Sequence, residues 1–142
     1  TVLAFPFSIR LFASHTLWNI SGNPKFDAAT AQWGEEWRMP TKDAIRELIV
    51  ECDWIYGNLN GVNGSKVVGP NGNSIFLPLP GRIDDEYDEH LEYAGLNGYY
   101  WSSTPENEDN NKAFALDLDN TYGTDYDEYY RYRGSSIRPV SD

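Results

Sequence analysis

Cysteine, histidine and positive charge are scarce in this chain of 142 residues. The single cysteine, Cys52, cannot form an internal disulfide or a thiolate metal site, and we expect it in the core. Eleven Lys and Arg side chains stand against 22 Asp and Glu, which gives a formal net charge of -11. A field of that sign repels phosphates and anionic lipid headgroups, so we expect no nucleic-acid partner.

Long apolar runs are also missing. A membrane-spanning helix needs about 20 apolar residues in a row. The most apolar stretch, residues 1–18, is interrupted by Pro6, Ser8, Arg10, Ser14 and His15. It also lacks the charged start and unbroken apolar run of a signal peptide. The sequence therefore predicts no direct insertion into a membrane.

The apolar residues that are present suffice for one core. Hydrophobic residues make up 40% of the chain and aromatic residues 15%, enough to fill one interior without disulfides or metal. We expect residues 1–142 to form a single domain, the C-terminal part of a longer protein.

Two helices are predicted near the start of the chain. Residues 26–34 are rich in alanine, follow a helix-start signal at residues 23–24, and end in Gly34, which suits the position after a helix. A second helix is predicted to begin with Thr41 as N-cap and Asp43 in its first turn. Its apolar stripe has helical spacing and consists of Ile45, Leu48, Ile49 and Cys52.

Short strands and loops are predicted for the rest. Residues 2–11 have the pattern of a strand broken by Pro6. Residues 57–74 are rich in Gly, Asn, Pro and Ser, which predicts loops, with short strands only at residues 67–68 and 75–77. Residues 114–119 alternate, and residues 130–140 are similar, which predicts two antiparallel strands covered on one side. The sum is an α+β domain rich in loops.

Catalytic and metal-binding patterns are sparse. His15 lies in an apolar segment and His90 follows an acidic run, so we expect a structural and a solvated histidine. Residues 84–89 hold five acids, whose oxygens suit Ca²⁺, but the alternate acids, central glycine and terminal glutamate of an EF-hand are missing. We expect a solvated loop there, and neither a metal nor a cofactor.

Tyrosines and acids gather towards the C-terminal end. Five of the ten tyrosines lie within residues 122–132, among Asp, Asn, Gly and Thr, a mixture typical of evolved binding loops. Consecutive Tyr129 and Tyr130 point to opposite faces of a strand, so at least one should be exposed. The alternative is that these tyrosines pack in the core.

Several motifs occur in an order that resembles one family. They are WGEEWRMPT at residues 33–41, CDW at 52–54, GPNGNSIFLP at 69–78, GYYWSST at 98–104, and Arg131 followed by GSSIRPV at 134–140. Over residues 26–140 the chain resembles the Fibrobacter succinogenes major paralogous domain, which is common in surface proteins of Bacteroidetes.

The resemblance implies a fold related to C-type lectins and formylglycine-generating enzymes, with two helices packed on a compact antiparallel β core and extensive irregular loops. It implies framework strands at residues 100–103 and 137–140, with Trp101 and Arg138 as framework residues. The enzymes use two cysteines, whereas this chain has one. Calcium-dependent lectins use a Glu-Pro-Asn loop, whereas residues 105–107 read Pro-Glu-Asn. Neither activity carries over.

The resemblance also extends to the variable proteins of diversity-generating retroelements. These share the fold and carry randomised residues on one exposed face near the C-terminus, where adenine mutagenesis turns Asn codons into Tyr, Asp, Ser, Gly or Thr. The segment from Asn107 onward looks similar. Glu106, Glu108, Lys112 and Glu128 do not fit that origin.

These observations predict a non-enzymatic ligand-binding domain without catalytic residues, displayed extracellularly on a bacterial cell surface or phage tail fibre. Its role would be adhesion or phage receptor binding, and its partner a protein or glycan on a cell surface. The predicted ligand-binding residues point outward: Asn107, Asp109, Asn111, Asp117, Asp119, Tyr122, Tyr126, Asp127, Tyr129, Tyr130 and Tyr132. Two alternatives stay open, a formylglycine-generating-type enzyme that uses carboxylates and a structural module that spaces other domains.

Overall fold

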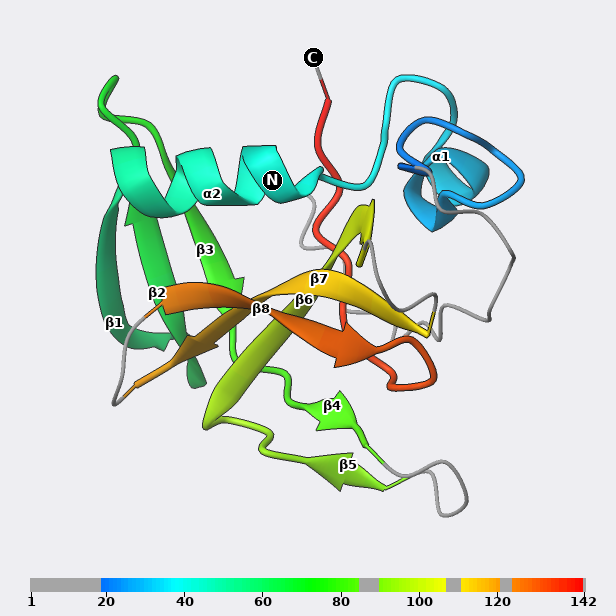
Figure 1. Ribbon diagram of the computed structural model, residues 1–142. Helices are drawn as coiled ribbons and strands as arrows, with labels where there is room; N and C mark the ends of the chain where they lie inside the picture. Colours follow the sequence, from blue (N-terminus) through cyan, green and yellow to red (C-terminus); the bar gives the residue numbers. More distant parts are fainter. Residues whose placement is uncertain (1–18, 85–89, 107–110, 121–123, 142) are drawn as a thin grey trace.

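The computed structural model describes residues 19–84, 90–106, 111–120 and 124–141, which form two helices and three antiparallel sheets (Figure 1). The helices are α1 (Ala28–Trp33) and α2 (Lys42–Glu51). The first sheet consists of β1 (Asp53–Leu59), β2 (Val62–Val68) and β3 (Ser74–Pro78) in that order. The second pairs β4 (Arg82–Ile83) with β5 (Leu91–Glu92), and the third consists of β6 (Asn97–Pro105), β7 (Lys112–Asp119) and β8 (Thr124–Tyr130). The predicted α+β class is confirmed.

Both predicted helices are present, and both begin at a capping side chain. Thr41, the predicted N-cap of α2, accepts a hydrogen bond from the backbone N–H of Ala44 at 3.1 Å. The N-cap of α1 is Asp27, whose Oδ1 accepts from the N–H groups of Ala29 and Thr30. A side-chain acceptor at this position satisfies donors that the first helical turn leaves without partners.

Two hydrophobic clusters fill the interior on opposite faces of the β6–β8 sheet. Cluster 1 consists of Ile20, Ala29, Met39, Trp101, Ala113, Ala115 and Ile137. Cluster 2 consists of Ile45, Val67, Leu77, Leu79, Tyr100, Leu116 and Leu118. Successive residues of β7 enter different clusters because side chains alternate along a strand. Helix α2 runs over the first and third sheets and covers cluster 2 (Figure 1).

The prediction that residues 114–119 form a strand covered on one side only is wrong for the first half of β7. Four successive residues, Ala113 to Leu116, are buried, because clusters 1 and 2 lie against opposite faces of the strand there. Alternation begins at Asp117, which is partly exposed, while Leu118 is fully buried.

The loop predicted over residues 57–74 is wrong for its first half, which belongs to a β-hairpin. Strands β1 and β2 pair without interruption from Asp53↔Val68 to Leu59↔Val62. The turn between them is Asn60-Gly61, whose φ angles of 51° and 87° fit the type I′ turn that Asn-Gly favours. Glycine and asparagine within both strands concealed this hairpin signal. The strand predicted at residues 75–77 is present within β3.

The strand predicted over residues 130–140 is also wrong. Strand β8 ends at Tyr130, and a turn follows in which Arg133 N–H donates to Tyr130 O at 3.1 Å. The chain then makes isolated bridges with three separate segments: Gly134 with Ile83, Ser136 with Tyr100, and Val140 with Arg38. Because the partner changes each time, no ladder forms at the implied framework strand of residues 137–140. Residues 100–103 do lie within β6, and Trp101 is fully buried.

The strand expected within residues 2–11, His15 and residues 85–89 lie outside the described residues. His90 is exposed, as expected. Cys52 follows α2 and is half-buried at the edge of cluster 2, rather than inside the core. In the described ranges, no helix is both long enough and apolar enough to cross a bilayer.

Candidate functional site

The register of β7 and β8 gathers acids and one tyrosine on a single sheet face. Asp117 lies directly opposite Asp125, and Asp127 and Tyr129 follow at alternate positions along β8. Asp119 is on the same face of β7, because it is two residues beyond Asp117. We call Asp117, Asp119, Asp125, Asp127 and Tyr129 the acidic face. Asp125 and Asp127 are exposed, and Asp117, Asp119 and Tyr129 are partly buried.

Other predicted binding residues lie elsewhere. Tyr126 is on the opposite sheet face, packed against cluster 2, where Lys42 Nζ lies 5.3 Å from its ring centroid. Tyr130 is also on that face, with 41% of its surface exposed, and stacks on Tyr132 with ring centroids 5.5 Å apart. The expectation that one of Tyr129 and Tyr130 is exposed is therefore confirmed. Asn111 precedes β7 and is exposed, and Asn107, Asp109 and Tyr122 lie outside the described residues.

The guanidinium group of Arg82 contacts Tyr129 of the acidic face and two tyrosine rings beside that face. Arg82 Cζ is 4.4 Å from the ring centroid of Tyr99, 5.3 Å from that of Tyr129 and 5.6 Å from that of Tyr93. The rings of Tyr99 and Tyr129 meet edge to face at 5.5 Å. A cation that faces several rings is attracted by their π electrons, so Arg82 holds the tyrosines in place.

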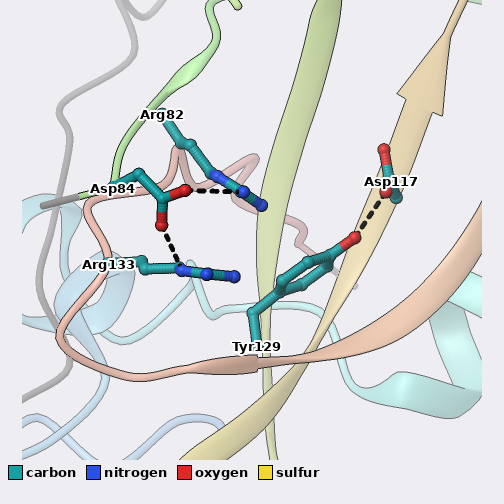
Figure 2. A network of polar contacts seen from close by, with 5 residues as sticks. All are labelled: Arg82, Asp84, Asp117, Tyr129 and Arg133. Carbon is teal, nitrogen blue, oxygen red and sulfur yellow. Dashed lines mark hydrogen bonds and ion pairs between the residues drawn. The ribbon is translucent and has the colours of Figure 1, made fainter. Parts of the chain in front are cut away.

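Asp84 joins this arrangement as a shared counter-ion. Its Oδ2 accepts a hydrogen bond from Arg82 Nη2 at 2.8 Å, and its Oδ1 forms an ion pair with Arg133 Nε. Figure 2 shows the carboxylate between the two guanidinium groups. The three side chains are only 11–21% exposed. The solvated loop predicted at residues 84–89 is thus wrong for Asp84, because Arg82, two residues before it, and Arg133, from the turn after β8, both pair with its carboxylate.

The ring of Tyr129 contacts Arg82 and Tyr99, and its hydroxyl is held by Asp117. The Tyr129 hydroxyl donates a hydrogen bond to Asp117 Oδ2 (Figure 2). Burial raises the pKa of the Asp117 carboxyl, and the bond from Tyr129 opposes part of that rise. Burial and the neighbouring carboxylate also raise the pKa of Tyr129, and burial raises the pKa of Tyr99 to about 12. The hydroxyl of Tyr129 therefore stays protonated and is engaged within the protein at neutral pH, so the groups open to a ligand on this face are the exposed carboxylates of Asp125 and Asp127 and the exposed part of the Tyr129 ring.

The sequence did not predict the basic half of this arrangement, Arg82 and Arg133. Arg82 stands two residues before Asp84, and a cation in a strongly acidic chain suggests a local counter-ion. No local pattern connects Arg133 or Tyr99 with either residue, because Tyr99 belongs to β6 and Arg133 follows β8.

Within the part of the chain that the structure describes, no group of three or more His, Cys, Asp or Glu side chains is arranged to hold a metal ion. No protein-family model, no curated protein and no solved structure matches this chain.

Proposed function

We propose that this chain is a ligand-binding domain without enzymatic activity, whose acidic face recognises a protein or a glycan on a cell surface. We also propose a C-type lectin-like fold and extracellular display, on a bacterial surface or a phage tail fibre, as the resemblance to the Fibrobacter domain implies. The observation that carries the binding proposal is the exposure of Asp125 and Asp127 on the same sheet face as the fixed ring of Tyr129.

Rigidity supports binding by this face. Tyr129 is held by a hydrogen bond to Asp117 and by contacts with Arg82 and Tyr99. A side chain that is already ordered loses little conformational entropy when a ligand binds, so it contributes more of its contact energy to affinity. The neighbouring exposed carboxylates favour a partner that carries positive charge or several hydroxyl donors.

Two adjacent residues on one strand provide the test. Asp127 and Glu128 are both exposed acids on β8, but they point to opposite sheet faces. We would screen the purified chain against a glycan array and a displayed peptide library, and measure each hit by biolayer interferometry. Asp127→Lys should weaken binding at least tenfold, whereas Glu128→Lys, with the same change in charge, should leave it within about twofold. Hits that respond equally to both variants, or a screen without hits, would contradict binding by the acidic face.

Diversification of this face can be tested at the level of the encoding DNA. Sequencing the encoding DNA from several isolates would compare codons 107–132 with codons 33–78. Changes restricted to adenine-derived codons, beside a template repeat and a reverse transcriptase gene, would support a diversity-generating retroelement. Uniform codons in both windows would leave a fixed adhesin.

One observation favours the enzymatic alternative. The Asp117 carboxyl, whose pKa burial raises, accepts a hydrogen bond from the Tyr129 phenol, and a carboxyl that keeps its proton to higher pH suits general acid catalysis. Mass spectrometry of the hits after incubation distinguishes the two functions. Unchanged ligand supports binding alone, whereas conversion that Asp117→Asn abolishes while binding persists would support an enzyme.

A further inference from the structure

The outer edge of β1 is a second surface, on the opposite side of the first sheet from β3. Strand β1 ends the order β1-β2-β3, and among the described residues no strand pairs with its other edge. Figure 1 shows β1 at the outer limit of that sheet. Proteins commonly protect such an edge with lysine, proline or a bulge. The sequence of β1, DWIYGNL, has no lysine or proline, and its register with β2 is unbroken.

The hairpin geometry identifies the backbone groups that face outward. In a type I′ turn the residue before the turn directs its carbonyl to the residue after it, so Leu59 bonds towards β2. Backbone polar groups alternate in direction along an antiparallel strand. Gly57 and Ile55 therefore also bond towards β2, and the N–H and C=O groups of Trp54, Tyr56 and Asn58 point to the free edge.

These outward groups are arranged symmetrically about Tyr56. When a second copy of β1 is laid antiparallel along this edge with Tyr56 opposite the partner's Tyr56, Trp54 stands opposite the partner's Asn58. All the outward N–H and C=O groups of the three residues then bond across the two-fold axis, as in an ordinary antiparallel ladder.

The side chains fit the same register. Ile55 is 55% exposed and would stand opposite the partner's Gly57. The space beside the Gly57 Cα is open, with no atom within 4 Å of where a Cβ would be. A depression of about 400 Å³ over this sheet is lined in part by Ile55, Gly57, Leu59 and Phe76. The isoleucine of each copy can therefore cover the glycine of the other.

The β1 edge itself carries little charge, although the chain has a formal net charge of -11. Asp53 is the only charged residue of β1 and lies at its first position. In the antiparallel register it stands opposite the partner's Leu59, so the two copies of Asp53 lie at opposite ends of the interface. The neighbouring strand contributes one cation to the same sheet, Lys66, which is exposed.

We propose that two copies of this chain associate through their β1 strands, antiparallel and centred on Tyr56, to form a continuous six-stranded sheet. A second copy satisfies at once the outward backbone groups, the exposed apolar side chains and the open space at Gly57. The pairing involves no residue of the acidic face, so it holds or fails independently of the proposed function.

Sedimentation velocity and light scattering over a concentration series test the association. The native chain should shift with concentration from its own mass of 16.2 kDa to twice that mass. Ile55→Lys places a charge on the edge, and Gly57→Val fills the open space with a side chain that suits a strand, so both should stay monomeric. Val50→Lys is the matched control: it introduces the same positive charge on α2, at a side chain that is 68% exposed, and it should dimerise like the native chain.

Cross-linking tests the register. In a background with Cys52→Ala, Tyr56→Cys should form an intermolecular disulfide on mild oxidation, because opposed residues of a hydrogen-bonded pair have Cα atoms about 5.5 Å apart, within disulfide range. Asn58→Cys should not, because each Asn58 lies opposite Trp54 rather than opposite its own copy.

Three results would overturn the proposal. Pairing through β1 is contradicted if the native chain stays monomeric throughout the series. It is equally contradicted if both edge variants still dimerise, or if the two cysteine variants cross-link to the same extent. Amide hydrogen exchange adds a readout on folding, since Gly57→Val should keep the slow exchange of the native core. A monomer whose Tyr56 amide is already protected would instead mean that another segment covers this edge, and would equally refute association of two copies.

Discussion

Replacement of the buried carboxylate of Asp27 should cost more stability than loss of an ordinary helix cap. Asp27 is fully buried and accepts four hydrogen bonds from backbone N–H groups. Two of them cap α1, and the other two come from Gly22 at 2.8 Å and Met39 at 2.9 Å. One side chain thus connects the segment before α1, the first turn of α1 and the segment that leads to α2.

The magnitude follows from the burial of each donor. Loss of the cap costs about 1 kcal/mol. The N–H of Met39 is buried and would stay without a partner, at about 2 kcal/mol, whereas water can reach the N–H of exposed Gly22. We therefore expect Asp27→Ala to lower the free energy of unfolding by about 3 kcal/mol. Asp27→Asn should cost less, about 2 kcal/mol, because it keeps one acceptor oxygen. The remaining cost arises because its NH₂ group faces N–H donors and cannot accept from them.

Urea unfolding followed by tryptophan fluorescence measures these differences. Thr41→Ala is the matched control, because that N-cap accepts one bond, from Ala44 N–H, and should cost about 1 kcal/mol. If Asp27→Ala were no more destabilising than Thr41→Ala, the bond from Met39 would contribute nothing, and the reasoning from burial would be refuted.

Three further predictions concern the arginine pair, a constrained glycine and the buried phenols. Asp84→Ala removes the shared counter-ion of two mostly buried guanidinium groups, so urea unfolding should show a loss of about 2 kcal/mol; unchanged stability would mean that water replaces the ion pairs. Gly81→Ala places a Cβ 2.1 Å from a carbonyl oxygen of β5, at a φ of +73°. Its melting temperature should fall well below that of Gly72→Ala, because Gly72 has a similar φ of +82° but open space around it. Equal losses would contradict the steric argument. The raised pKa values of Tyr99, to about 12, and of Tyr129 mean that folding favours the neutral phenols. Their contribution to stability is complete below about pH 10 and disappears as pH rises through the raised pKa values. Ultraviolet titration should therefore show a fraction of the tyrosines that ionises late. A single step at the ordinary tyrosine pKa would contradict the raised values.

Local sequence signals were sufficient for the helices. The Thr41 cap, the apolar stripe of α2 and Gly34 after α1 act through contacts within a few residues, so the sequence alone determines them. The Asn-Gly turn of the first hairpin is equally local, but its strands contain Gly57, Asn58 and other weak strand formers. Pairing with β3 and cover by α2 overcame those preferences, which are weak compared with tertiary packing.

The faces of the C-terminal strands required the tertiary structure. Alternation along residues 114–119 is visible in the sequence, but only the packing of both hydrophobic clusters shows that β7 is covered on two sides at its start. The segment after Tyr130 is extended, yet its pairing partners come from three different parts of the chain. An extended pattern in a sequence does not reveal which segment will provide the partner.

The sequence by itself determined the acidic charge, the α+β class, the two helices and the concentration of tyrosine and aspartate near the C-terminus. Only the tertiary structure decided which of those residues share a face. The carboxylate of Asp84, just after β4, pairs with Arg82 of β4 and with Arg133 of the turn after β8. Because all three side chains are mostly buried, the carboxylate depends on both cations. Arg82 lies only two residues before Asp84, but Arg133 is far from it in sequence, and only folding brings that second guanidinium to the carboxylate and removes the water around it.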